Sequence, residues 1–278
     1  MRDSQQRIGL FDSGVGGLTV LRQMCRQLPQ ESLLYFADSA RLPYGTRSPQ
    51  EILQFVREIL DWMCGQNVKM IIMACNTSSA LALETVRKEY DIPILGVILA
   101  GAKAAVKRGK RVGVIATPAT VNSHAYRQAI QGINPQTKVW EIACSKFVHL
   151  IEQNQLHTDY TRQIAQQYLA PLIEQQLDTL VYGCTHYKHL ETTIRSILSD
   201  SVQIIDPAEH IVVAAEKELA LLGLSNNLLS QPTRFYVSGS VQQFASLSQQ
   251  WLGYYPQVEQ ITTQMPAEVM VLNQSSII

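Results

Sequence analysis

The chain has 278 residues, of which 46% are hydrophobic and 17% charged, so it carries enough apolar material for one large or two modest domains and too little charge for disorder. Lysine plus arginine number 23, as do aspartate plus glutamate, and no basic stripe is present, which argues against a nucleic-acid-binding protein. No apolar run is long enough to span a membrane. The absence of a signal-peptide core and the five scattered cysteines argue against a secreted protein. We expect a reduced, cytoplasmic, globular protein with neither nucleic-acid nor membrane partners.

Short apolar runs alternate along the chain with longer amphipathic stretches. The predicted strands are, in chain order, Ile8–Phe11, Leu33–Phe36, Met70–Ala74, Ile94–Ile98, Arg111–Ala116, Thr137–Glu141, Thr179–Tyr182 and Gln203–Ile205. Helical spacing predicts a helix over Gly16–Leu28, with Cys25 on its apolar face, and another over Pro49–Cys64. Because continuously apolar strands alternate with helices, we predict an α/β fold whose parallel sheets are covered by helices on both faces.

The last third of the chain adds further elements. A helix is predicted over Glu209–Leu222 and a polar linker over Ser225–Pro232. A strand, a helix and a strand follow, at Arg234–Val237, Val241–Leu252 and Val258–Ile261. From Met265 onward no pattern is visible, which predicts a loose tail.

The two halves of the chain resemble each other. Three pairs of segments recur in the same order at an offset of roughly 105 residues. They are Ile8–Ser13 with Val112–Thr117, Met70–Thr77 with Thr179–His186, and Ile92–Leu95 with Val202–Ile205. This pattern predicts an internal duplication that produces two similar α/β lobes, with a boundary near Gly96–Ala102 and the active site in the cleft between them. The expected domains are 1–98 completed by 209–262, then 99–208, then a tail over 263–278.

One cysteine stands at the same place in each half. Cys75 and Cys184 each close an apolar strand and precede small hydroxyl or amide residues. Ligands gather at the carboxyl ends of parallel strands, and a helix N-terminus there favours a carboxylate and lowers the pKa of a thiol from about 8.5. Duplication would bring these two thiols onto facing lobes. We expect Cys25, Cys64 and Cys144 to be inert buried side chains.

Two facing thiols suit a redox disulfide, a metal site or acid–base chemistry. No Cys-x-x-Cys spacing supports the first. A metal would draw on Cys184, His186 and His189, but Cys75 has no histidine or carboxylate beside it in sequence, so no metal is predicted. One thiolate and one thiol can remove a proton from one face of a carbon and return a proton to the other. The pair therefore favours inversion of a stereocentre without a cofactor.

Two loops add polar candidates. Asp12 and Ser13 open a glycine-rich turn that matches neither a dinucleotide-binding fingerprint nor a P-loop, and they could hold an ammonium group and a carboxylate or only cap a helix. Tyr44 and Gly45 end a turn-rich loop that could contact a ligand or be a plain connection. His186 is placed to influence proton transfer at a neighbouring thiol.

Four motifs together resemble the glutamate racemases, enzymes that interconvert L- and D-glutamate without a cofactor. The motifs are Ile8–Gly17, Pro43–Gly45, Ala74–Thr77 and Gly183–Tyr187, in the family's order, within a resemblance over about residues 7–262. The resemblance implies two α/β lobes that close over the substrate, a cytoplasmic homodimer, and a role in supplying D-glutamate for peptidoglycan.

The resemblance also implies roles for single residues. Cys75 matches the cysteine that takes the α-proton from D-glutamate, and Cys184 the one that takes it from L-glutamate. Asp12 and His186 match the residues that assist these two thiols respectively. The substrate-binding residues implied are Asp12, Ser13, Tyr44, Gly45, Asn76, Thr77, Glu152, Thr185 and His186.

The sequence departs from the family pattern near the second cysteine. Lys188 and His189 follow Tyr187 where a proline is usual, and Tyr182 replaces a smaller aliphatic residue. We expect these departures to affect the cleft rim or subunit contacts rather than the chemistry. Glu152 lies in an amphipathic segment and, without the resemblance, would be read as a surface residue.

Other functions compete with this reading. A related two-cysteine aspartate racemase or a maleate isomerase-like enzyme would share the paired thiols, whereas the glycine-rich and Pro-Tyr-Gly motifs favour glutamate. A two-lobed amino-acid-binding protein without turnover would have no need of two acid–base thiols.

Overall fold

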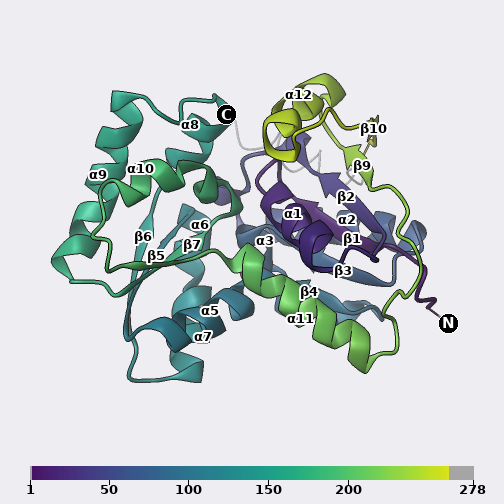
Figure 1. Ribbon diagram of the computed structural model, residues 1–278, viewed down its shortest axis with the longest axis horizontal. Helices are drawn as coiled ribbons and strands as arrows, with labels where there is room; N and C mark the ends of the chain where they lie inside the picture. The colour runs from purple at the N-terminus through teal and green to yellow at the C-terminus, as the bar shows by residue number, and fades with distance from the viewer. Residues whose placement is uncertain (1, 263–278) are drawn as a thin grey trace, which may run out of the picture.

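The computed structural model describes residues 2–262, so the tail predicted from Met265 onward lies outside the described residues. Two parallel sheets stand side by side, each with helices on both faces (Figure 1). We call each sheet with its helices a lobe. The predicted α/β fold with two parallel-sheet lobes is confirmed. Among residues 2–262, no helix is both long and apolar enough to cross a membrane.

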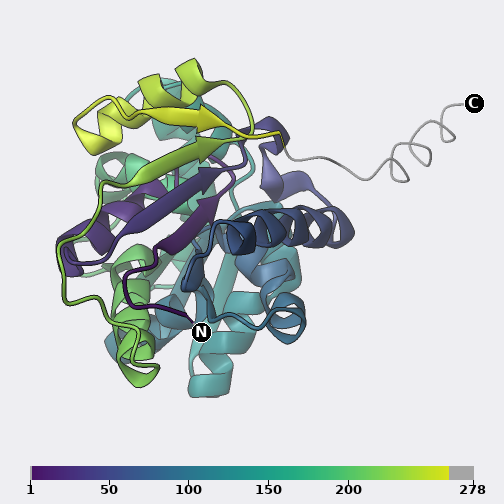
Figure 2. The ribbon, with the colours of Figure 1, turned by 90° about the vertical axis from the view of Figure 1, so that its right-hand side faces the viewer.

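The first sheet draws its strands from both ends of the chain. Its order is β10-β9-β2-β1-β3-β4, and every pairing is parallel. The strands are β1 (Ile8–Asp12), β2 (Leu33–Ala37), β3 (Met70–Met73), β4 (Ile94–Gly96), β9 (Arg234–Val237) and β10 (Val258–Gln260). Figure 2 shows β9 and β10, in green and yellow, extending the sheet beyond β2.

The second sheet comes from one continuous stretch of chain. Its order is β6-β5-β7-β8, again parallel throughout. The strands are β5 (Arg111–Ala116), β6 (Lys138–Ala143), β7 (Thr179–Gly183) and β8 (Gln203–Ile205). This order repeats β2-β1-β3-β4 of the first sheet, in agreement with the predicted duplication. The domain limits at residues 98 and 208 stay a prediction.

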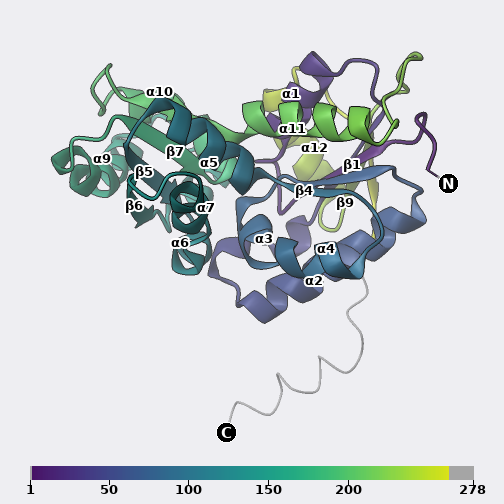
Figure 3. The same cartoon turned by 90° about the horizontal axis from the view of Figure 1, so that it is seen from below.

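Helices pack on the four sheet faces and build four apolar cores. Those of the first lobe are α1 (Leu18–Gln27), α2 (Pro49–Gly65), α3 (Asn76–Leu81), α4 (Leu83–Glu89), α11 (Pro207–Leu221) and α12 (Val241–Leu252). Helices α1, α11 and α12 cover one face of the first sheet, and α2, α3 and α4 lie on the other (Figure 3).

The second lobe is covered in the same manner. Its helices are α5 (Val97–Arg108), α6 (Pro118–Ser123), α7 (Ala125–Ile133), α8 (Phe147–Glu152), α9 (Asp159–Glu174) and α10 (Glu191–Arg195). Three 3₁₀ turns complete the described elements, namely η1 (Ser39–Arg41), η2 (Tyr44–Thr46) and η3 (Thr185–Leu190).

Local sequence explains where several helices begin. Helix α2 starts at Pro49 after Ser48, whose side chain accepts a hydrogen bond from the Glu51 N–H in a capping box. Helix α6 begins in a similar way: the Thr117 side chain accepts a hydrogen bond from the Thr120 N–H, and Pro118 occupies the first helical position. These caps place Thr117 at the carboxyl end of β5, where it faces the other lobe.

One predicted strand is wrong at its end. The run Ile94–Ile98 stops being a strand at Gly96, and α5 begins at Val97. A Cβ atom on Gly96 would lie 2.6 Å from Leu83 Cδ2 and 3.0 Å from Ser79 Oγ, so the chain passes α3 and α4 too closely for a side chain. The apolar residues Val97 and Ile98 are buried in the first turn of α5 instead of in the strand.

The prediction that Cys25 and Cys64 are buried is also wrong. Cys25 and Cys64 are exposed. Helix α1 buries Val20 and Met24 together with its leucines, which turns Cys25 toward solvent. Cys64 lies in the last turn of α2, beyond the final buried residue of that helix, Met63.

Candidate active site

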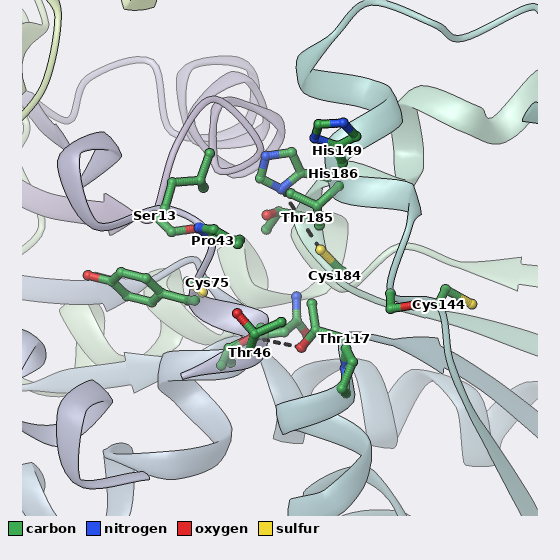
Figure 4. A pocket seen from close by; sticks show the side chains of 18 of the residues that line it. Ser13, Pro43, Thr46, Cys75, Thr117, Cys144, His149, Cys184, Thr185 and His186 are labelled. Carbon is green, nitrogen blue, oxygen red and sulfur yellow. Dashed lines mark hydrogen bonds between the residues drawn. The ribbon is translucent and has the colours of Figure 1, made fainter. Parts of the chain in front are cut away.

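A cavity of about 130 Å³ lies between the two lobes at the carboxyl ends of the strands. Figure 4 shows the side chains of Cys75 and Cys184 reaching it from different lobes. Of the residues predicted from sequence, those that line the cavity are Ser13, Tyr44, Gly45, Cys75, Asn76, Thr77, Glu152, Cys184, Thr185 and His186. The remaining one, Asp12, is fully buried beside it.

Cys75 lies two residues after the end of β3 and directly before α3. Its side chain is buried, and its carbonyl oxygen accepts a hydrogen bond from the Ser78 hydroxyl at 3.0 Å. Burial, and then the negative charge of Asp12, raise the pKa of Cys75 to about 12. The predicted lowering of this pKa is wrong, because desolvation of the thiolate outweighs the helix N-terminus.

Cys184 has a different neighbour. Its Sγ lies 3.9 Å from Nδ1 of His186, and Nε2 of that histidine lies 2.7 Å from Oε1 of Glu152. Burial alone would lower the pKa of His186, but its hydrogen bonds to Cys184 and Glu152 raise the pKa well above the usual value. The raised pKa favours the protonated form of His186, whose ring lies between a thiol and a carboxylate.

Glu152 is the site residue that the local sequence describes least well. Its amphipathic segment suggests a surface carboxylate, yet the Glu152 side chain is only 16% exposed and is paired with buried His186. The reading of Glu152 as a plain surface residue is wrong. Its position follows from α8, whose last turn lies at the cleft.

Asp12 connects the lobes from the end of β1. One carboxylate oxygen accepts a hydrogen bond from the Gly14 N–H at 3.0 Å, and the other accepts one from the Thr185 hydroxyl at 3.1 Å. Burial raises the pKa of Asp12, while the positive charge of His186 opposes the shift. Asp12 can therefore exchange a proton at a pH where an exposed carboxylate could not.

The glycine-rich turn after Asp12 is explained by close contact between the lobes. A Cβ atom on Gly16 would lie 2.4 Å from Thr185 Oγ1 and 2.5 Å from His186 Nδ1. Glycine at this position lets the first lobe touch the segment that carries both residues.

Tyr44 and Gly45 form one wall of the cavity. The Tyr44 hydroxyl donates a hydrogen bond to Asp38, and burial raises the pKa of Tyr44 well above its usual value. Asp38 also accepts hydrogen bonds from Arg41 Nε at 2.7 Å and the Ser238 hydroxyl at 2.8 Å. The phenol hydroxyl is thus held by the protein, and Tyr44 is among the residues that line the cavity.

Asn76 and Thr77 open α3 and reach across to the second lobe. The Tyr126 hydroxyl donates to Asn76 Oδ1 at 2.6 Å. Thr77 Oγ1 lies 2.9 Å from Thr117 Oγ1 and 3.2 Å from Thr120 Oγ1. The lobes therefore meet through a group of buried hydroxyls at the floor of the cleft.

Sequence reasoning missed several residues that line the cavity. They include Leu42, Thr46, Thr117, Ser145, Val148 and His149. Thr117 had a usable signal, because the duplication makes it the counterpart of Ser13 after the matching strand. Cys144, predicted to be buried, is buried and borders the cavity. Within residues 2–262, no group of three or more histidine, cysteine, aspartate or glutamate side chains is arranged to hold a metal ion.

Comparisons with known proteins place this architecture in the amino-acid racemase class. Residues 8–215 match the model of the Asp/Glu/Hydantoin racemase family. A glutamate racemase of Rippkaea orientalis is 65% identical over 93% of this chain and 92% of its own length. The chain belongs to the Asp/Glu/Hydantoin racemase family and, within it, to the glutamate racemases.

Solved structures of glutamate racemases have the same fold as this chain. A glutamate racemase isoform from Bacillus anthracis superposes with a TM-score of 0.90 at 38% identity, covering 93% of this chain and 98% of its own. A glutamate racemase from Francisella tularensis, solved in complex with D-glutamate, gives a TM-score of 0.89 at 36% identity, covering 94% and 99%.

Proposed function

We propose that the protein interconverts L- and D-glutamate without a cofactor, with Cys75 and Cys184 as the two acid–base groups. The observation that carries the proposal is that both thiols line one cavity from different lobes. A base on one face of the α-carbon and an acid on the other invert its configuration in a single binding site.

From L-glutamate, the thiolate of Cys184 removes the α-proton and becomes a thiol. The thiol of Cys75 then gives its proton to the opposite face and becomes a thiolate, so protons and charge balance. The raised pKa of Cys75 favours this direction in the ligand-free enzyme, because it keeps that sulfur protonated. The imidazolium of His186 stabilises negative charge on the neighbouring sulfur.

From D-glutamate, the same steps run in reverse and Cys75 must first lose its proton. Asp12 is proposed as the acceptor, because its charge is coupled to Cys75 and burial raises its own pKa. Excluding water from the closed cleft strengthens a thiolate as a base, since the sulfur loses its hydration.

The polar groups of the cavity suit a dicarboxylate with one ammonium group. Hydroxyl and amide donors come from both lobes, at Ser13, Asn76, Thr77 and Thr185, and the backbone of Gly45 also borders the cavity. The Francisella relative was solved with D-glutamate, which supports this substrate. Asp12 and Glu152 add negative charge that favours the ammonium group.

The biological setting follows from the family resemblance. We infer a cytoplasmic enzyme that supplies D-glutamate for peptidoglycan synthesis and acts as a homodimer. Light scattering on purified protein tests the dimer, and D-glutamate auxotrophy after deletion of the gene tests the supply role.

The deciding experiment is proton exchange. Purified protein is incubated with L-glutamate in D₂O without added cofactor, D-glutamate is followed by chiral chromatography, and deuterium at Cα by mass spectrometry. Cα-deuterated D-glutamate is the expected product. If reduced, folded protein exchanges neither enantiomer, the proposal is wrong. The same assay with aspartate and maleate would then test the related enzymes, and calorimetry would test a binding protein without turnover.

A further inference from the structure

A stacked aromatic pair outside the cavity joins the two lobes. The ring centroids of His189 and Trp251 lie 3.4 Å apart, with the ring planes inclined by 30°. His189 belongs to η3, which follows β7 of the second sheet, and Trp251 lies in the last turn of α12, between β9 and β10 of the first sheet. The contact therefore crosses from one lobe to the other.

The contact depends on the ring faces rather than on polar bonds. His189 Nε2 and Trp251 Nε1 are both buried and have no hydrogen-bond partner among the described residues. Burial, together with the positive charges of His186, Arg22 and Lys188, lowers the pKa of His189 to about 3. His189 thus presents a neutral, flat ring to Trp251 at neutral pH.

The same short segment is held at its other end. The Thr185 hydroxyl donates to Asp12 of the first lobe, beside the cavity. The Tyr187 hydroxyl donates to the Cys144 carbonyl oxygen at 3.0 Å within the second lobe. His186 lies between Thr185 and His189, so a contact with the first lobe exists on each side of it. Together with the close approach of Gly16 to Thr185 and His186, these two contacts hold the segment against the first lobe along its length.

We propose that the His189–Trp251 stack is a second tie between the lobes, which holds the segment bearing Thr185 and His186 in the geometry that binds substrate. His189 and Trp251 are positioning residues, since neither lines the cavity. His189 directly follows Lys188, which stands where the family pattern usually has a proline. The inference rests on the proposed racemisation, because its readout is turnover of glutamate.

The test is a double-mutant cycle of His189→Ala, Trp251→Leu and both together, assayed with each enantiomer at one pH. Loss of the stack lowers the fraction of enzyme molecules in the conformation that binds glutamate. A saturating concentration of glutamate restores that fraction, because it draws the enzyme into the binding conformation. We expect KM to rise about five- to tenfold with kcat changed less than about twofold, on the scale of an aromatic pair. A tenfold change corresponds to about 1.4 kcal/mol. Because the two residues act through one contact, the double variant should resemble the single variants.

Enantiomers have equal free energies, so kcat/KM must fall equally in the two directions, which checks the data internally. His189→Phe keeps an aromatic face and should restore KM. Gln250→Ala, an exposed change on the same turn of α12, is the matched control and should leave both constants unchanged. If His189→Ala does not fold, His189→Asn removes the aromatic face at similar size and should show the same rise in KM.

Three outcomes overturn the tie. The first is a lower melting temperature in the single variants with KM unchanged, which would make the stack merely structural. The second is a double variant whose KM rises by the product of the single effects. The third is no rescue by His189→Phe. A wild-type protein that does not racemise glutamate would overturn the proposed function as well, whereas normal wild-type turnover with unaltered variants overturns the tie alone.

Discussion

Cys75 and Cys184 occupy matching places in the two halves of the molecule, each after the third strand of its repeat. Cys75 is followed by an α-helix and lies near the carboxylate of Asp12, which helps to raise its pKa to about 12. Cys184 is followed by a 3₁₀ turn, and its Sγ lies 3.9 Å from Nδ1 of His186, whose pKa is raised by its hydrogen bonds to Cys184 and Glu152. The duplication has preserved the position of the sulfur and changed the charge beside it.

The difference shows how one scaffold can produce two unlike acid–base groups. A neighbouring anion keeps a thiol protonated, and a neighbouring cation stabilises a thiolate. In the proposed reaction the ligand-free enzyme therefore holds a protonated acid on the Cys75 side, which suits L-glutamate first. The following experiments test this contrast.

Replacing either cysteine should have the largest effect. Cys75→Ser and Cys184→Ser should each lower kcat about 10³-fold, since a serine hydroxyl does not ionise near neutral pH and acid–base groups contribute on this scale. Binding of D-glutamate, measured by calorimetry, should persist. Cys25→Ser and Cys64→Ser are exposed controls that should retain activity. Racemisation at the wild-type rate by Cys75→Ser would refute the two-base assignment.

Alkylation should distinguish the two thiols directly. At pH 8 a thiol with a pKa of about 12 is thiolate in only about one molecule in 10⁴. Iodoacetamide should therefore modify Cys75 about 10²-fold more slowly than Cys184 in ligand-free enzyme, as followed by peptide mass spectrometry. The rate at Cys75 should increase with pH up to about 12, and Asp12→Asn should raise it at lower pH. Equal rates at the two cysteines would remove the contrast.

Weakening the His186–Glu152 pair should have an intermediate effect. Glu152→Gln removes the carboxylate that favours imidazolium, and we expect kcat to fall about tenfold, the scale of a charge-assisted hydrogen bond. Because the pKa of His186 is raised on folding, protonation of His186 stabilises the folded protein. This stabilisation is complete below the unfolded-state pKa of about 6.5 and is lost as the pH rises through the folded-state pKa.

Urea unfolding checks this pH dependence. The difference in unfolding free energy between wild type and Glu152→Gln should be largest below about pH 6.5 and should shrink as the pH rises through the raised pKa of His186. A difference that grows with pH would mean that His186 is not the charged partner of Glu152.

Loosening the wall formed by Tyr44 should have the smallest effect. Asp38→Asn weakens the network that holds the tyrosine, and we expect KM for glutamate to rise about threefold with little change in kcat, the scale of one hydrogen bond. Tyr44→Phe removes one bond of that network and should show a similar rise in steady-state kinetics. A fall in kcat with KM unchanged would place Tyr44 in the chemistry instead.

Much of the fold could be predicted because its strands are continuous apolar runs bounded by glycine or polar residues. Helix α12 begins and ends at the predicted residues, Val241 and Leu252. The internal repeat also anticipated the matching strand orders. The error at Ile94–Ile98 has a physical reason, since a short apolar run fits a buried strand and a buried helix equally well.

The site was predictable in its residues but not in its electrostatics. Motifs identified Cys75, Cys184 and most of the cavity lining. The local pattern placed the Cys75 thiol at a helix N-terminus and predicted a lowered pKa, whereas three-dimensional burial beside Asp12 raises it. The contact between Glu152 and His186 joins residues 34 positions apart, and no local pattern encodes it.

The first sheet cannot be completed until late in translation. Its β9 strand, which pairs with β2, comes after the entire second sheet in the chain. A ribosome that has reached residue 205 has produced every strand of the second sheet, but the apolar edge of β2 (Leu33–Ala37) is still unpaired. Unpaired strand edges promote aggregation of nascent chains. The half whose first strands are synthesised first is therefore the half whose sheet is completed last.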